Sequence, residues 1–140
     1  MSTALEGRCL CGAVRMSAVP EAERLFACHC SICRLWTGGV FLGFSAEAAD
    51  VTITGPVRHY RSSPFGERTS CESCGSPLWF REDGKAYEFT AGLFPATRDW
   101  PLHNENYTDR AHRALLLAGD HKRVTSADYE ARAPHVEALS

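Results

Sequence analysis

Seven cysteines in three clusters are the residues of this sequence best suited to chemistry. They are Cys9 and Cys11; Cys28, Cys30 and Cys33; and Cys71 and Cys74. An odd number of thiols cannot pair completely as disulfides, whereas clustered thiolates are preferred ligands of zinc. Zinc holds four ligands tetrahedrally with sulfur at about 2.3 Å, so thiolates that share an ion lie less than about 4 Å apart. The close spacing therefore predicts zinc binding, which the poor match to common iron–sulfur spacings also favours over iron.

The spacing also predicts how the thiols divide between two ions. The middle cluster places Cys28, Cys30 and Cys33 within six residues, so these three most simply share one ion. A set of three leaves a position for water or substrate, as in catalytic zinc sites. The two remaining pairs supply four thiols and would tie the N-terminal segment to the middle of the chain. Such a four-cysteine site is typical of structural zinc. The four ligands predicted for it are Cys9, Cys11, Cys71 and Cys74.

Local spacing predicts the geometry of each cluster. Two-residue spacers favour a tight turn around the ion, whereas one-residue spacers in a strand direct both thiols to one face. His29 lies between Cys28 and Cys30, so a strand would aim it away from the metal. We therefore expect a structural role for His29 rather than a fourth ligand. His103 is either a ligand or proton carrier near the open position, or an ordinary polar histidine.

Length and composition limit the classes of protein that fit. The 140 residues, 44% of them hydrophobic, predict a single domain over residues 1–140 with a loose C-terminal tail. We expect its core to span about residues 5–125. The formal charge of -2 and the pI near 6.3 argue against a nucleic-acid partner. No apolar run approaches the roughly 20 residues of a membrane span. Residues 1–7 lack signal-peptide features, which predicts a reducing, cytoplasmic location.

Short apolar and β-branched runs separated by glycine and proline predict a mainly β fold. Asp83-Gly84 marks a hairpin turn. Helix is expected only as short turns, at residues 45–50 with Ser45 as N-cap and at residues 126–133 with Ser126 as N-cap. The predicted strands are Gly7 to Ala18 in two pieces around Gly12, Val40 to Phe44, Val51 to Thr54, Val57 to Arg61, Leu78 to Arg81 and Tyr87 to Ala91.

At these motifs the chain resembles the glutathione-dependent formaldehyde-activating enzyme family, which includes centromere-protein-V-like proteins. The order and spacing of all seven cysteines match. The matching segments are GRCLCGAV (7–14), CHCSICRLWTGG (28–39), the stretch 55–60 that ends in HY, and CESCGSPLWF (71–80); AGLF (91–94) and PLH (101–103) match more loosely. Beyond His103 the sequence departs from the family, because residues 104–123 are largely polar where the family often has an apolar segment.

The resemblance implies a β-tent fold with a structural zinc on the four-cysteine set and a catalytic zinc on the three-cysteine set. It also implies carbon–sulfur lyase chemistry on the adduct of glutathione and formaldehyde, S-hydroxymethylglutathione. A substrate thiol in the open position would ionise beside the metal. Arg34 directly follows Cys33, and its guanidinium is a candidate for binding a glutathione carboxylate. The alternative is a non-catalytic, zinc-stabilised binding module on the same scaffold.

Overall fold

The computed structural model describes residues 3–137, and strands dominate its secondary structure. The mainly β class and the short helices expected from the sequence are confirmed. The chain divides into two compact units, each built from two separate stretches of sequence: Met1–Glu23 with Gly43–Trp100, and Arg24–Leu42 with Pro101–Ser140. The expectation of a single domain over residues 1–140 stays a prediction.

The first unit contains two antiparallel sets of strands. In the smaller set, β1 (Leu5–Arg8) pairs with β2 (Arg15–Ala18), which pairs with β5 (Val51–Thr54). In the larger set, the part of β4 (Phe41–Ala46) that starts at Gly43 pairs with β9 (Tyr87–Thr90), followed by β8 (Pro77–Glu82), β7 (Gly66–Cys71) and β6 (Val57–Ser63). Asp83-Gly84 forms the predicted turn between β8 and β9.

Aromatic side chains fill the core of the first unit. The ring of Phe94 packs edge-on against Phe44 with centroids 4.9 Å apart, and lies 5.2 Å from Phe89. All three rings are almost completely buried. Three 3-10 helices connect the strands, namely η1 (Ala48–Asp50), η2 (Ala91–Leu93) and η3 (Pro95–Thr97).

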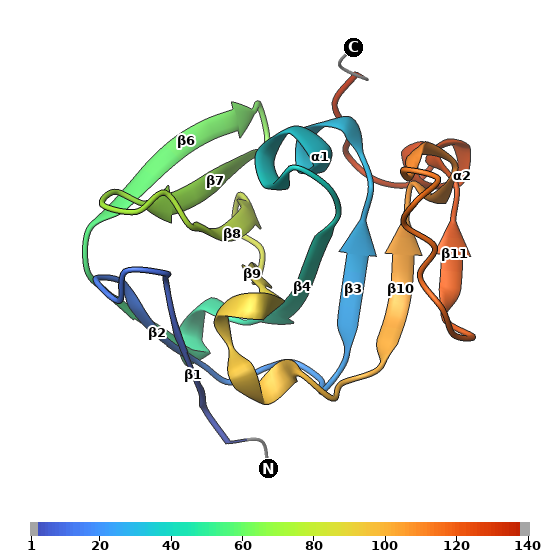
Figure 1. The fold of residues 1–140 in the computed structure, drawn as a ribbon. Helices are drawn as coiled ribbons and strands as arrows, with labels where there is room; N and C mark the ends of the chain where they lie inside the picture. Colours follow the sequence, from blue (N-terminus) through green and yellow to red (C-terminus); the bar gives the residue numbers. More distant parts are fainter. Residues whose placement is uncertain (1–2, 138–140) are drawn as a thin grey trace. The chain divides into compact units, whose positions relative to one another are not determined.

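The second unit is built around three parallel strands. β10 (Leu102–Asn106) lies between β3 (Leu25–Cys28) and β11 (Lys122–Val124), and Figure 1 shows the three arrows side by side and pointing the same way. The unit also contains α1 (Ser31–Thr37), η4 (Thr108–Arg110) and α2 (Ser126–Glu130). None of β3, β10, β11 or α1 was predicted from the sequence. Parallel pairing between distant segments leaves no local turn signal that would reveal it.

Two predicted helix starts were wrong. Ser45 lies in strand β4, and the following 3-10 helix begins at Ala48 after Glu47, so the expected cap at Ser45 is absent. Tertiary pairing of β4 with β9 decides the conformation there. The second helix begins at Ser126, but its N-cap is Thr125, whose side chain accepts a hydrogen bond from the backbone N–H of Asp128. The end of the predicted loose tail, at 138–140, lies outside the described residues.

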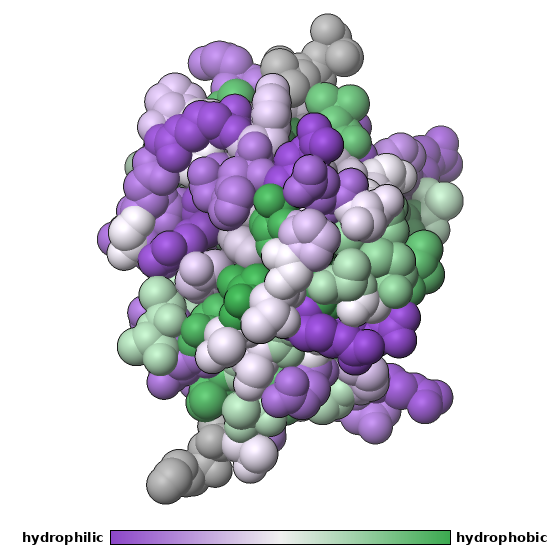
Figure 2. Space-filling view, turned by 90° about the vertical axis from the view of Figure 1, so that its left-hand side faces the viewer, coloured by the Kyte–Doolittle hydropathy of each residue, from purple (hydrophilic) through white to green (hydrophobic). Residues whose placement is uncertain are grey.

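The described part of the chain has no helix long and apolar enough to cross a membrane. On the face drawn in Figure 2, hydrophilic side chains are interspersed with smaller hydrophobic groups.

Candidate metal centres

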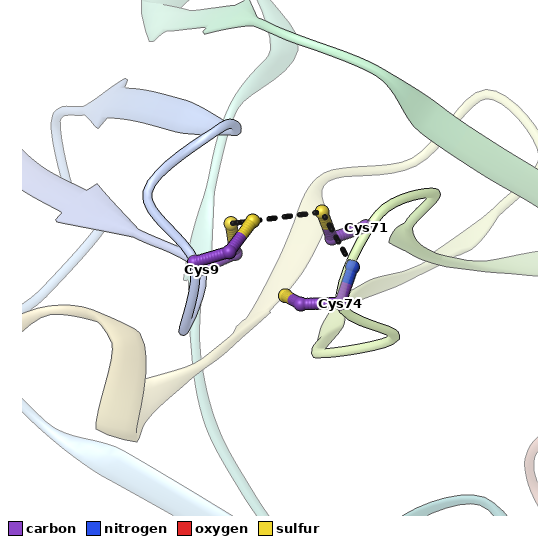
Figure 3. Close-up of side chains that lie close together, drawn as sticks. Cys9, Cys71 and Cys74 are labelled. Carbon is purple, nitrogen blue, oxygen red and sulfur yellow. Dashed lines mark hydrogen bonds between the residues drawn. The ribbon is translucent and has the colours of Figure 1, made fainter.

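The four-cysteine cluster is assembled from two loops of the first unit. Its four Sγ atoms all lie within 4.8 Å of one another. The Sγ of Cys11 is 3.6 Å from that of Cys9 and 3.8 Å from that of Cys71. Figure 3 shows the sulfurs of Cys9, Cys71 and Cys74 gathered between the two loops. Thiolates that share a tetrahedral zinc lie less than about 4 Å apart. The Cys9–Cys11 and Cys11–Cys71 sulfur pairs already meet this limit, so the donor set suits a zinc ion.

The two loops that carry these cysteines share a backbone pattern. The N–H of Cys9 donates to the carbonyl of Val14 at 3.1 Å, and the N–H of Cys71 donates to the carbonyl of Ser76 at 3.0 Å. Inside each loop a glycine with positive φ donates back to the first cysteine's carbonyl: Gly12 at φ 82° and Gly75 at φ 79°. Because side chains strain this left-handed backbone, glycine suits both positions.

Strand geometry does not position Cys9 and Cys11, contrary to the sequence expectation. Strand β1 ends at Arg8, and both cysteines lie in the turn that follows. The turn aims backbone N–H groups at the sulfurs: Val14 donates to Cys9 at 3.3 Å and Ala13 donates to Cys11 at 3.4 Å. Donors of this kind favour thiolates over thiols, as a metal site requires.

Neighbouring groups also shift the pKa values of these thiols. The side-chain and backbone hydrogen bonds of Ser76 lower the pKa of Cys74 to about 5, so Cys74 is a thiolate at neutral pH. Cys11 behaves in the opposite way: its bond from Ala13 acts to lower its pKa, but Cys9 and the other cysteines, together with desolvation, raise it to about 11. Crowded thiolates repel one another, and a cation between them removes that penalty.

The three-cysteine cluster lies where β3 leads into α1. Cys28 ends the strand, Cys30 is the N-cap of the helix and Cys33 lies in its first turns. Their Sγ atoms all lie within 4.8 Å of one another, and the N–H of Cys33 donates to the Sγ of Cys30 at 3.4 Å. The expected strand alternation of Cys28 and Cys30 was wrong, because the chain turns into a helix between them. The turn nevertheless brings all three predicted thiols together.

Electrostatics in this cluster also favour a cation. Hydrogen bonds to Cys30 and Cys33, followed by burial, raise the pKa of Cys28 well above the usual value of a thiol. Three adjacent thiolates are unfavourable until a positive ion offsets their charge. Among the described residues, no histidine, aspartate, glutamate or further cysteine joins the group as a fourth ligand. The residues present thus fit an ion held by three thiolates.

The two histidines considered as fourth ligands lie outside this group. The Nε2 of His29 is 2.7 Å from the Oε2 of Glu105, and the His29 side chain is completely buried. This contact agrees with the structural role expected of His29. His103 lies exposed on β10. The side chain of Arg34 donates through Nε to the carbonyl of His29 at 3.0 Å, which holds its guanidinium beside the backbone of the cluster.

Sequence reasoning missed Glu105 and His121. Glu105 bonds both His29 and His121, whose Nε2 lies 2.6 Å from Oε1 of the carboxylate. His121 gave no signal that distinguished it from the other histidines of the chain. Only the parallel pairing of β10 with β3 and β11 brings these residues together.

The fold and the sites define a mainly β protein with two thiol clusters that can each hold a metal ion. The family model of the glutathione-dependent formaldehyde-activating enzyme matches residues 4–110. The chain belongs to this family, as the resemblance predicted.

Two curated relatives and one solved structure are similar to the chain. An uncharacterized lyase of Schizosaccharomyces pombe is 40% identical over 92 residues, which cover 64% of this chain and 67% of that protein. A Halomonas elongata protein, named as a candidate glutathione-dependent formaldehyde-activating enzyme, is 38% identical over 86 residues, covering 54% of each chain. The chain thus spans about half of that second relative. A crystal structure of a Rhodobacter sphaeroides protein matches 70% of this chain and 99% of its own, with a TM-score of 0.57 and 18% identity, and supports the fold alone.

Proposed function

We propose that the chain is a zinc-dependent carbon–sulfur lyase that acts on the adduct of a thiol and an aldehyde, with glutathione and formaldehyde as the pair. The observation that carries the proposal is the three-cysteine group, which offers three thiols within 4.8 Å and no fourth protein ligand among the described residues. Family membership and the names of the two relatives supply the reaction class.

In this proposal the two thiol clusters have different roles. Cys9, Cys11, Cys71 and Cys74 hold a structural zinc with a complete set of four ligands. Cys28, Cys30 and Cys33 would hold the second zinc, which would lower the pKa of a substrate thiol bound beside them. Three thiolates against a charge of +2 leave a net charge of -1, which weakens the pull on a carbonyl oxygen. The site is therefore better suited to delivering a thiolate than to activating water.

The reaction itself needs no oxidant and no further reactant. In the direction of addition, the sulfur of glutathione forms a bond to the carbonyl carbon of formaldehyde. The π electron pair moves to the oxygen, which takes up the proton that the thiol released. The product is S-hydroxymethylglutathione, and lyase action is the reverse, in which the carbon–sulfur bond breaks.

Arg34 is the residue we assign to glutathione. Its Nε bond to His29 leaves the two Nη groups without a hydrogen bond or ion pair within the described part of the chain. A guanidinium fixed in this way can take a carboxylate through two parallel hydrogen bonds. We also propose a cytoplasmic location, because metal binding requires these cysteines reduced and the cytoplasm keeps thiols reduced.

Exchange spectroscopy tests the proposed reaction directly. Glutathione and carbon-13 formaldehyde interconvert slowly with their adduct, and the rate is measured by NMR with and without the zinc-loaded protein. We expect catalytic amounts of the protein to accelerate the exchange, and Cys33→Ser to lose that acceleration while it remains folded. A folded wild-type protein with two zinc ions and no acceleration would overturn the lyase proposal and favour the non-catalytic binding module.

A further inference from the structure

A buried carboxylate joins two histidines beside the three-cysteine group. Glu105 Oε2 lies 2.7 Å from Nε2 of His29, and Oε1 lies 2.6 Å from Nε2 of His121. The three side chains are only 5%, 0% and 1% exposed, respectively. The Nε of Arg123 lies 3.8 Å from Oε1. Neither the lyase proposal nor the metal ligands account for this arrangement.

Burying a carboxylate is costly unless hydrogen bonds and opposite charge compensate for the lost water. Here burial acts to raise the pKa of Glu105, but the bonds from His121 and His29 outweigh it and lower the pKa. The carboxylate accepts one bond at each oxygen, so both imidazoles direct their Nε2–H toward it. The Nδ1 atoms of His29 and His121 are buried with no hydrogen-bond partner among the described residues.

His29 lies between two of the three thiols and is held at every polar group of its backbone. Its N–H donates to the carbonyl of Asn106 at 3.0 Å, and its carbonyl accepts from Nε of Arg34 at 3.0 Å. The imidazole is fixed by Glu105. Because Cys28 and Cys30 are its direct neighbours, the backbone angles of His29 help to set the distance between their sulfurs.

The carboxylate itself is fixed from the other side. Glu105 lies on the central strand β10, opposite Ala27 of β3 and Arg123 of β11. His121 directly precedes β11. Arg123 of β11 holds the segment before this strand, because its Nη2 donates to the carbonyls of Leu117 and Gly119, both at 3.0 Å. His121 and Arg123 lie beyond residues 4–110, so they belong to a part of the chain that the family model does not match.

We propose that Glu105, held in place by His121, is a positioning residue that acts through His29 to fix the Cys28 and Cys30 thiolates at the spacing a metal ion requires. The inference rests on the proposed second zinc. It does not require that the protein be a lyase, since its consequence is metal affinity at the three-cysteine site.

The test measures zinc affinity by competition with a chromophoric chelator, together with the thiolate charge-transfer band of the cobalt form. For Glu105→Ala we expect the ion at the three-cysteine site to bind about 10- to 100-fold more weakly, the usual effect of losing an outer partner of a metal site. The ion at the four-cysteine site should be unchanged. In a Cys33→Ser background, Glu105→Ala should have no effect on the ion that remains.

Conservative and control variants separate positioning from general destabilisation. Glu105→Gln should keep the zinc affinity of the three-cysteine site within about tenfold of wild type. The amide oxygen can accept from Nε2–H of His29, and the amide N–H can donate to Nε2 of His121 when that ring carries its proton on Nδ1. Glu67 accepts from the exposed His59 at 2.9 Å, so Glu67→Ala removes a surface pair of the same type and should change neither affinity. If Glu105→Ala does not fold, His121→Ala takes its place, with a smaller loss expected at the same ion.

The outcomes distinguish this inference from the proposed function. A wild-type protein that binds only one zinc would overturn the three-cysteine zinc and the inference with it. Two bound ions with wild-type affinities and cobalt spectra in a folded Glu105→Ala or His121→Ala would overturn the positioning role while leaving the proposed function intact. Selective weakening of one ion, relieved in Glu105→Gln, would support it.

Discussion

The Sγ atoms of Cys11 and Cys71 lie 3.8 Å apart, although 60 positions of sequence separate these residues. The contact joins the turn after β1 to the end of β7 within the first unit. A metal shared by these thiols would close a long loop, and such a link stabilises the folded state partly by restricting the unfolded chain. The four-cysteine site should therefore govern stability.

Single cysteine substitutions should separate the two sites. We expect Cys71→Ser to unfold or aggregate, because a structural zinc supplies folding free energy. Cys33→Ser should remain folded and bind about one zinc ion fewer than wild type, which should bind two. Circular dichroism and elemental analysis of protein purified without added metal provide both readouts. A folded Cys71→Ser protein with its full metal content would contradict this division.

Gly55 should tolerate no side chain. It adopts φ +106°, and a Cβ there would lie 2.1 Å from the carbonyl oxygen of Ala13, within the loop that carries Cys11. Because the clashing atom belongs to the backbone of Ala13, the loop that carries Cys11 must move to accommodate the new methyl group. We expect Gly55→Ala to lower the free energy of unfolding by about 2–4 kcal/mol and to weaken zinc binding at the four-cysteine site.

Gly84 provides the matched control for that substitution. It also has a positive φ, +73°, but a Cβ there would meet nothing within 4 Å. Gly84→Ala should therefore cost only about 1 kcal/mol, the backbone strain alone. Urea denaturation of both zinc-loaded variants measures the difference. Equal costs would show that the loop beside Gly55 can move without penalty.

Glu88 should make stability depend on pH near neutrality. Burial, which outweighs the opposing effect of Arg68, raises its pKa from 4.5 to about 7. Between these values the folded state holds a proton that the unfolded state has released, so the free energy of unfolding falls as pH rises. Glu88→Gln cannot ionise and should be about 1–2 kcal/mol more stable than wild type at pH 8.

The pH series that tests this runs from pH 6 to pH 8 with zinc present. The two proteins should differ least at pH 6, where wild-type Glu88 is largely protonated, and most at pH 8. If the free energies of unfolding of the two proteins differ by the same amount at every pH in this range, Glu88 is not the source of the pH dependence.

Arg34 should affect glutathione binding more than turnover. Lysine retains the charge but cannot form two parallel hydrogen bonds to a carboxylate or donate through Nε to His29. We expect Arg34→Lys to raise the KM for glutathione about tenfold with a smaller change in kcat. The matched control is Arg113→Lys at an exposed position of the same unit, which should leave both parameters unchanged. Equal KM values in the two variants would remove Arg34 from the glutathione site.

Local signals predicted the first unit better than the second. The two extended pieces around Gly12 and the hairpin turn at Asp83-Gly84 follow from residues adjacent in sequence, and both are confirmed. The second unit depends on parallel strands whose partners lie far apart along the chain, such as Ala27 and Glu105. Pairing of that kind is set by the packing of the whole unit, so the short segments themselves contain little information about it.

The sequence by itself determined which thiols group together, because thiols a few residues apart can share an ion with little loop-closure cost. That rule separated Cys28, Cys30 and Cys33 from the other four cysteines, and their sulfurs lie together as predicted. Only the tertiary structure decided what surrounds them. Glu105 and His121 lie close to His29 because two parallel strand pairings align segments that are distant in sequence. The free energy of that alignment comes from burial and hydrogen bonds between distant segments, which the local sequence pattern does not predict.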